Sequence, residues 1–204
     1  MMGLFKQITD KPWERTGIIG GLRAEGTFSA PPEKVALVFF LVAASIVFSL
    51  FGVSYVIRME LPDWIPVSEP SQLWFNTALL VISSFLFQRA KTLISNGKKS
   101  VTSTFASGGV FAILFIAAQM VTWQNLQAQG LFMTSNPANS FYYLLTGLHA
   151  LHILGGLWVW SKSLLRLLSG AAQEELRLSI ELCTVYWHFL LIVWIAVFAV
   201  LSNT

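Results

Sequence analysis

The chain has 204 residues, of which 55% are hydrophobic and only 11% are charged. Soluble domains carry roughly a quarter charged residues, so this composition excludes an ordinary water-soluble protein and indicates lipid as the main solvent. The formal net charge is only +3, and the basic residues are accounted for by membrane topology below, so they do not indicate nucleic-acid binding.

Residues 1–33 are polar and mixed in charge, and we expect them to form a cytoplasmic arm. Pro31 and Pro32 at its end disfavour helix until the first apolar segment begins. The arm lacks the apolar core that a cleavable secretory signal needs. We therefore expect two regions, the arm over 1–33 and a membrane domain over 34–204.

Five apolar segments follow, and each is long enough as a helix to cross a hydrocarbon core of about 30 Å. The segments are continuous rather than alternating, which excludes barrel strands, so each must satisfy its backbone hydrogen bonds within a helix. The predicted fold is all-α, an integral membrane bundle of five transmembrane helices. Their expected bounds are about 35–57, 72–90, 101–123, 139–160 and 180–202.

The distribution of basic residues predicts the orientation of these helices. Lys and Arg favour the cytoplasmic side in short loops, and 12 of the 13 in this chain fall on one side of the predicted spans. The other side has only Arg58, together with Glu60, Asp63 and Glu69. We therefore expect a cytoplasmic N-terminus and a periplasmic C-terminus.

Ionisable residues at membrane depth are costly and are therefore candidates for function. The fourth span carries His149 and His152, three residues apart, and the fifth carries His188, with Glu181 at its cytoplasmic end. Imidazole binds metals and haem, but an HxxH pair is a weak metal signal without further ligands. A haem held by two histidines stays open. Neutral histidines, hydrogen-bonded between helices or to Glu181, are the favoured interpretation.

The remaining pattern argues against chemistry carried out by this chain alone. The first four spans have no acidic residue in their interiors, although proton conduction normally uses carboxylates spaced through a span. The sequence shows no phosphate-binding loop, nucleophile–base pair or CxxC motif. A free-standing transporter is also disfavoured, because charged or broken-helix features at the midplane are not visible. We expect no catalytic residue and no metal site.

Two histidine motifs carry a resemblance to a known family. They are Thr146-Gly147-Leu148-His149-Ala150-Leu151-His152 and Tyr186-Trp187-His188-Phe189, the second followed by Trp194. Together they resemble subunit III of the haem–copper terminal oxidases, in its short five-helix bacterial form. Weaker similarities over residues 35–202 are Glu181, Tyr55-x-x-Arg58, Trp74-Phe75-Asn76-Thr77, and Ser83-Ser84 before Gln88-Arg89-Ala90.

The resemblance implies a non-catalytic subunit of a proton-pumping cytochrome c oxidase, which reduces dioxygen to water in the bacterial inner membrane. Haem and copper would lie in partner subunits, with no cofactor in this chain. The expected protein partners are oxidase subunits I and II and a small subunit IV. Such subunits resemble a V-shaped bundle docked on the catalytic subunit, with phospholipids held in the cleft and a route for dioxygen through them.

The resemblance also assigns roles to individual residues. It implies a structural polar cluster that fixes the packing of the fourth and fifth spans, formed by His149, His152, Glu181 and His188. It implies contacts with lipid phosphates at Arg58, Arg89 and Arg177.

This sequence departs from the family pattern at three acidic positions, which are occupied here by Ala44, Thr122 and Leu191. If those acids assist proton delivery in relatives, this chain has lost that contribution, and structural support is the favoured role. Subunit III of a quinol oxidase and an accessory protein of nitric oxide reduction stay open as alternatives. The pattern Met59-Glu60 and Asp63-Trp64 is more similar to the cytochrome c group.

Overall fold

The computed structural model describes residues 31–66, 71–98, 100–170 and 173–202. Nearly all of the predicted arm over 1–33 therefore lies outside the described residues. The chain divides after Ala36 into two units. Of the first unit only residues 31–36 are described, and all contacts discussed below lie within the second, Leu37–Thr204.

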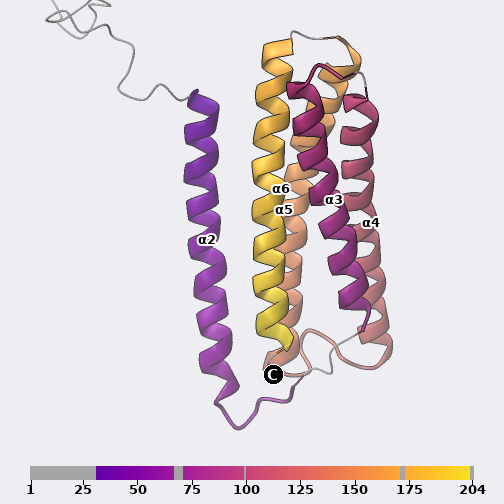
Figure 1. Ribbon diagram of the computed structural model, residues 1–204. Helices are drawn as coiled ribbons and strands as arrows, with labels where there is room; N and C mark the ends of the chain where they lie inside the picture. Colours follow the sequence, from indigo (N-terminus) through magenta and orange to yellow (C-terminus); the bar gives the residue numbers. More distant parts are fainter. Residues whose placement is uncertain (1–30, 67–70, 99, 171–172, 203–204) are drawn as a thin grey trace, which may run out of the picture. The chain divides into compact units, whose positions relative to one another are not determined.

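Five helices make up most of the described chain (Figure 1). They are α2 (Pro32–Met59), α3 (Gln72–Ser95), α4 (Val101–Ala128), α5 (Pro137–Leu168) and α6 (Gln173–Ser202). All five are long and apolar enough to cross a membrane, and the described residues contain no strand. The predicted all-α fold with five membrane-spanning helices is confirmed. The orientation of the termini stays a prediction.

The helices extend beyond the predicted spans, and their ends follow local sequence signals. Gly97, Gly130 and Gly170 have φ of 64°, 80° and 72° and directly follow the last residues of α3, α4 and α5 and their caps. Glycine adopts this left-handed conformation without a steric penalty, so it ends a helix readily. At the start of α5, the Asn136 side chain accepts a hydrogen bond from the Asn139 amide at 2.9 Å. Apolarity marks only the part of a helix that lies in lipid, whereas capping residues mark its ends.

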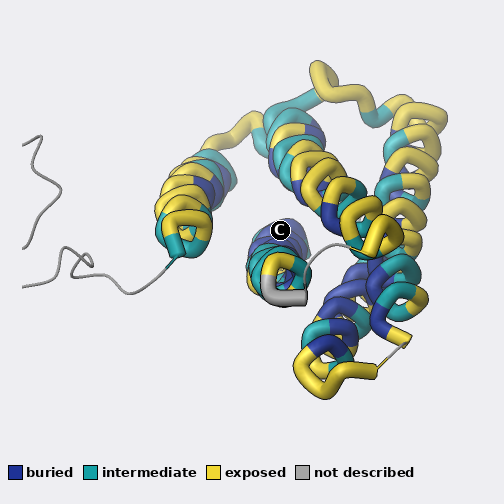
Figure 2. The backbone as a smooth tube through the Cα atoms, turned by 90° about the horizontal axis from the view of Figure 1, so that it is seen from above, coloured by how far each residue is buried: buried dark blue, intermediate teal, exposed yellow. Residues whose placement is uncertain are grey.

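Helices α3, α4, α5 and α6 pack against one another, with α3 between α4 and α6 and with α5 against α4 and α6. Their buried residues face the inside of this group, as the view from above shows (Figure 2). Among the described residues, no Cα atom of α2 lies within 8 Å of another helix. Only Ala44, Phe48 and Tyr55 of α2 are buried. Helix α2 is therefore held by side chains rather than by close backbone packing.

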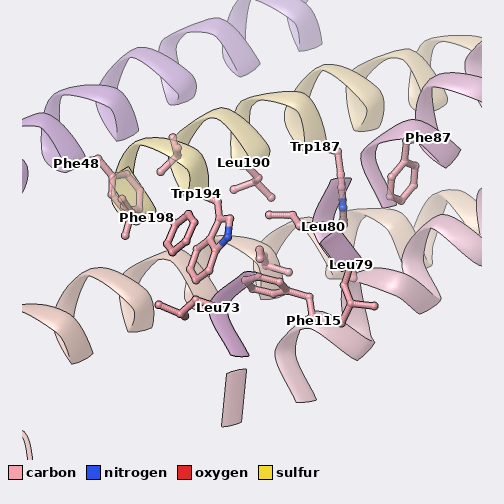
Figure 3. Close-up of a cluster of buried hydrophobic side chains, with 14 of the residues drawn as sticks. Phe48, Leu73, Leu79, Leu80, Phe87, Phe115, Trp187, Leu190, Trp194 and Phe198 are labelled. Carbon is pink, nitrogen blue, oxygen red and sulfur yellow. The ribbon is translucent and has the colours of Figure 1, made fainter. Parts of the chain in front are cut away.

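Aromatic side chains fill the core between these helices (Figure 3). The rings of Phe87 and Trp187 lie 4.4 Å apart between centroids, and those of Phe115 and Trp194 lie 4.9 Å apart. Lipid tails are as apolar as these side chains, so the bundle is held by close packing rather than by exclusion from water. Large rings fit here because glycines lie beside them, as at Gly108, which faces the Phe87 ring.

Candidate functional site

His149 lies on α5 at the centre of the bundle and is fully buried. Its imidazole is surrounded by the rings of Trp194, Phe115 and Phe48, at centroid distances of 5.1, 5.9 and 6.4 Å. Neither ring nitrogen has a hydrogen-bond partner. The hydrogen bonds expected for this residue are therefore not made, because aromatic rings occupy the space around it.

His152 and His188 share a different arrangement. The Nδ1 atom of His152 lies 2.7 Å from the Leu148 carbonyl oxygen, and that of His188 lies 2.8 Å from the Thr184 carbonyl oxygen. A carbonyl oxygen only accepts hydrogen bonds, so Nδ1 carries the proton in both residues. The two side chains are thereby tied to the preceding turn of their own helices.

The four residues of the predicted polar cluster make different contacts. His149 and His152 share the Phe48 ring, which lies 5.2 Å from the His152 ring between centroids. On α6, His188 lies close to Ser84 of α3, with Nδ1 3.5 Å from Oγ. Glu181, also on α6, has its carboxylate 3.9 Å from the Lys91 ammonium. The joint role of the four residues in fixing helix packing stays a prediction.

The arginines proposed to contact lipid phosphates have different surroundings. Arg58, in the last turn of α2, donates a hydrogen bond of 2.7 Å to the Asp63 carboxylate and forms an ion pair with it. Arg89 and Arg177 are exposed on α3 and α6. Within the described residues, no group of three or more His, Cys, Asp and Glu side chains could hold a metal ion. Lipid contact by the three arginines stays a prediction.

A second polar cluster was not singled out by the sequence analysis. Asn76 of α3 donates through Nδ2 to Gln119 Oε1 of α4 at 2.8 Å and lies 3.4 Å from Thr122 Oγ1. All three residues are fully buried. The signal was present, since amides within an apolar span are as notable as histidines. The sequence analysis considered only ionisable residues at membrane depth and therefore did not predict this cluster.

Two apolar grooves lie along α6. The first has a volume of about 350 Å³ and is lined by α2, α5 and α6, through Ser45, Phe48, Ser49, Gly52, Leu145, Phe189, Ile192, Val193, Ala196, Val197 and Val200. The second has a volume of about 360 Å³ and is lined by Leu41, Gln88, Lys91, Thr184, Val185, His188, Phe189 and Ile192. Phe189 and Ile192 line both grooves. The two grooves therefore adjoin along one face of α6, and Lys91 lies at one end.

Comparison with known proteins identifies the family. The family model described as "Cytochrome c oxidase subunit III" matches residues 34–202, which include all five predicted spans. "Cytochrome c oxidase subunit 3" of Synechocystis sp. is 31% identical over 183 residues, covering 86% of this chain and 77% of that protein. "Probable cytochrome c oxidase subunit 3" of Mycobacterium bovis is 33% identical over 131 residues, covering 61% of this chain and 62% of that protein.

A third relative has a name that combines two oxidase subunits. "Heme-copper oxidase subunit I+III" of Aeropyrum pernix is 30% identical over 125 residues, covering 60% of this chain and 15% of that much longer protein. The family match, the relatives and the five membrane-spanning helices agree with one another. The chain is a multi-pass membrane protein that belongs to the cytochrome c oxidase subunit III family.

Proposed function

We propose that this chain is a non-catalytic subunit of a proton-pumping haem–copper oxidase in the bacterial inner membrane, where it stabilises the catalytic subunit and holds phospholipid. The family match over residues 34–202 carries the proposal. Subunit I is the expected neighbour, because the Aeropyrum relative is named as a joined subunit I and III. Haem and copper reside in subunits I and II, and a small subunit IV completes the assembly.

The adjoining grooves along α6 support the lipid-holding part of the proposal. From Thr184 to Val200 the helix rises by roughly 24 Å at about 1.5 Å per residue, which is comparable to the length of a phospholipid. The groove between α2, α5 and α6 is lined mainly by apolar side chains, and the end at Lys91 also presents Gln88 and His188. Acyl chains fit the apolar part, while an ammonium and an amide suit a phosphate group. Lipid chains in the groove also offer dioxygen an apolar route.

Structural support, rather than proton delivery, is the favoured contribution of this chain. The family's acidic positions are occupied by Ala44, which is buried, by Thr122, which is fully buried, and by Leu191, which is partly buried. None of these side chains binds or releases a proton near neutral pH. The catalytic subunit would therefore take up its protons without carboxylates from these three positions.

Cytochrome c is the proposed electron donor, since the matched relatives are named cytochrome c oxidase subunits. The discriminating experiment is purification of the intact complex from native membranes through a tag on this chain. We expect co-purification of a haem-containing subunit I and oxygen consumption driven by reduced cytochrome c. Oxygen consumption driven only by quinol would identify quinol as the electron donor. Recovery of the chain without any haem-containing partner would overturn the proposal.

Lipid retention is tested separately by native mass spectrometry of the purified complex. Lys91→Gln removes the positive charge at the end of the groove, and we expect about tenfold weaker retention of a phospholipid, equivalent to roughly 1.4 kcal/mol. Lys162→Gln is the matched control, because Lys162 lies over the Trp158 ring at 4.8 Å and lines neither groove. Equal lipid retention in both variants would contradict a headgroup site at Lys91.

A further inference from the structure

Two opposite charges meet at the polar end of the grooves along α6. The Lys91 ammonium of α3 lies 3.9 Å from the Glu181 carboxylate of α6. The two groups form an ion pair, but this distance is too long for a hydrogen bond. The side chains are 37% and 31% exposed, so both charges can be reached by a molecule outside the bundle. The pair therefore presents a cation and an anion side by side.

This ion pair lies where the second groove begins. Lys91 lines the groove, and so does Thr184, three residues after Glu181 and therefore on the same side of α6. Further into the span, the lining changes from the amide of Gln88 to apolar side chains such as Phe189. A molecule that fills the groove must therefore carry charge at one end and be apolar along the rest of its length.

We propose that Lys91 and Glu181 together bind the headgroup of a phospholipid that carries ethanolamine. This inference rests on the proposed lipid-holding function and names the class of lipid. The phosphate contacts the Lys91 ammonium, and the primary ammonium of the headgroup donates hydrogen bonds to the Glu181 carboxylate. A short two-carbon link joins phosphate and ammonium, so the two charges of the headgroup also lie side by side. Gln88, one turn further into the span, offers its NH₂ group to an ester carbonyl of the lipid.

The Glu181 carboxylate is the group that distinguishes ethanolamine from other headgroups. An ionised carboxylate only accepts hydrogen bonds, and those from a charged donor are the strongest. A primary ammonium has three N–H donors, whereas the trimethylated nitrogen of choline has none. A glycerol headgroup has hydroxyl donors but no positive charge to offset the repulsion between its phosphate and Glu181. Arg177, exposed four residues before Glu181 on α6, attracts any phosphate and so does not select among headgroups.

The test is a competition between headgroups in the purified oxidase complex. The complex is delipidated and offered equal amounts of phosphatidylethanolamine, phosphatidylcholine and phosphatidylglycerol with identical acyl chains, and native mass spectrometry identifies the retained lipids. The lipid of this site is the one that is lost in Lys91→Gln. We expect about tenfold preference for the ethanolamine lipid over each of the others, the effect of one hydrogen bond to a charged group.

Equal retention of the three lipids at this site, or preference for the choline or glycerol lipid, would overturn the inference and leave the lipid-holding function intact. Identical lipid retention in Lys91→Gln and the unmodified complex would instead overturn the proposed headgroup site itself, and this inference with it. The two failures are therefore distinguishable.

Two further variants connect the preference to Glu181. Glu181→Gln removes the negative charge and should reduce the preference for the ethanolamine lipid over the choline lipid to about twofold or less. Glu175→Gln is the matched control, because Glu175 is exposed on the same helix and lines neither groove. It should keep the preference of the unmodified complex. An undiminished preference in Glu181→Gln would overturn the role of Glu181. The competition in the unmodified complex decides the headgroup preference even if Glu181→Gln fails to assemble.

Discussion

The Trp160 ring of α5 lies directly on Gly109 of α4, and a Cβ atom added to Gly109 would overlap the indole. The indole Nε1 of Trp160 also donates a hydrogen bond of 3.0 Å to the Phe105 carbonyl, one turn before Gly109. Glycine at this position therefore allows a tryptophan to lie flat on a neighbouring helix and bond to its backbone. This contact holds α4 and α5 together without a polar side chain on α4.

Gly109→Ala should destabilise the subunit in the purified oxidase by about 1–3 kcal/mol, the usual cost of overpacking a filled core. Thermal dissociation of the subunit, followed by gel or mass spectrometry, measures the effect. Gly155→Ala is the matched control, because its added Cβ meets no atom within 4 Å. It should be neutral or slightly stabilising, since alanine favours helix over glycine. Equal effects of both substitutions would contradict the packing argument.

Thr77→Val should destabilise the bundle by about 1–3 kcal/mol, the cost of leaving a buried donor unpaired. The Trp194 indole is buried and donates from Nε1 to Thr77 Oγ1 at 2.9 Å, across α6 and α3. The measurement is the thermal dissociation of the subunit. Thr92→Val is the control on the same helix, because exposed Thr92 bonds only to the Gln88 carbonyl. If Thr92→Val destabilised the bundle as much as Thr77→Val, the hydrogen bond from the indole would be shown to be unimportant for stability.

Phe48→Ala should loosen α2, which lacks close backbone packing with the other helices. Phe48 contacts both His149 and His152, and each aromatic pair contributes about 0.5–1.5 kcal/mol. We expect amide hydrogen exchange within α2 to rise about tenfold, which corresponds to ~1.4 kcal/mol. Phe39→Ala, at a position 72% exposed, should change little. Unchanged exchange in Phe48→Ala would mean that other contacts hold α2.

The loop after α2 should respond to pH through Asp63. A hydrogen bond from Arg58 lowers the pKa of the Asp63 carboxyl below its usual value. Because the pKa is lowered in the folded state, the stabilisation is present above about pH 4 and is lost as pH falls through the lowered value. The amide exchange rate at residues 60–64, divided by the intrinsic rate of an unprotected amide at the same pH, should therefore rise on acidification.

Asp63→Asn removes the titrating group and should make this relative exchange rate high and independent of pH. Glu60→Gln, in the same loop, is the control and should keep the pH dependence. If the pH dependence disappeared in Glu60→Gln, Glu60 rather than Asp63 would be the group that controls the loop.

His188→Ala should weaken retention of the subunit in the complex more than it slows turnover per haem. The imidazole is tied to Thr184 and lies beside Ser84, so its removal leaves polar groups unpaired between α6 and α3. Unpaired groups cost about 1–3 kcal/mol, which is enough to loosen an interface. Subunit stoichiometry and oxygen consumption are measured on the same preparation. A large loss of turnover with full retention would contradict a structural role.

The fold class follows from the sequence because lipid imposes a simple length requirement. A segment such as 101–123 must be a helix if it lies in the hydrocarbon core, whatever its neighbours are. The family resemblance also follows from the sequence, because His149, His152 and His188 lie in recognisable motifs. The ends of the helices were harder to predict from the sequence, because residues beyond the hydrocarbon core continue the helix until a glycine such as Gly170.

Which side of each helix faces inward was decided only by the tertiary structure. In water, the polar face of a helix shows which side is exposed, whereas in lipid both sides are apolar and the pattern is lost. The contacts of Trp160 with Phe105, of Trp194 with Thr77 and of Asn76 with Gln119 all join distant segments. Each depends on how the helices are rotated against one another. The sequence by itself determined that this chain is a helical membrane subunit, and the packing of large rings against small residues decided which side chains meet.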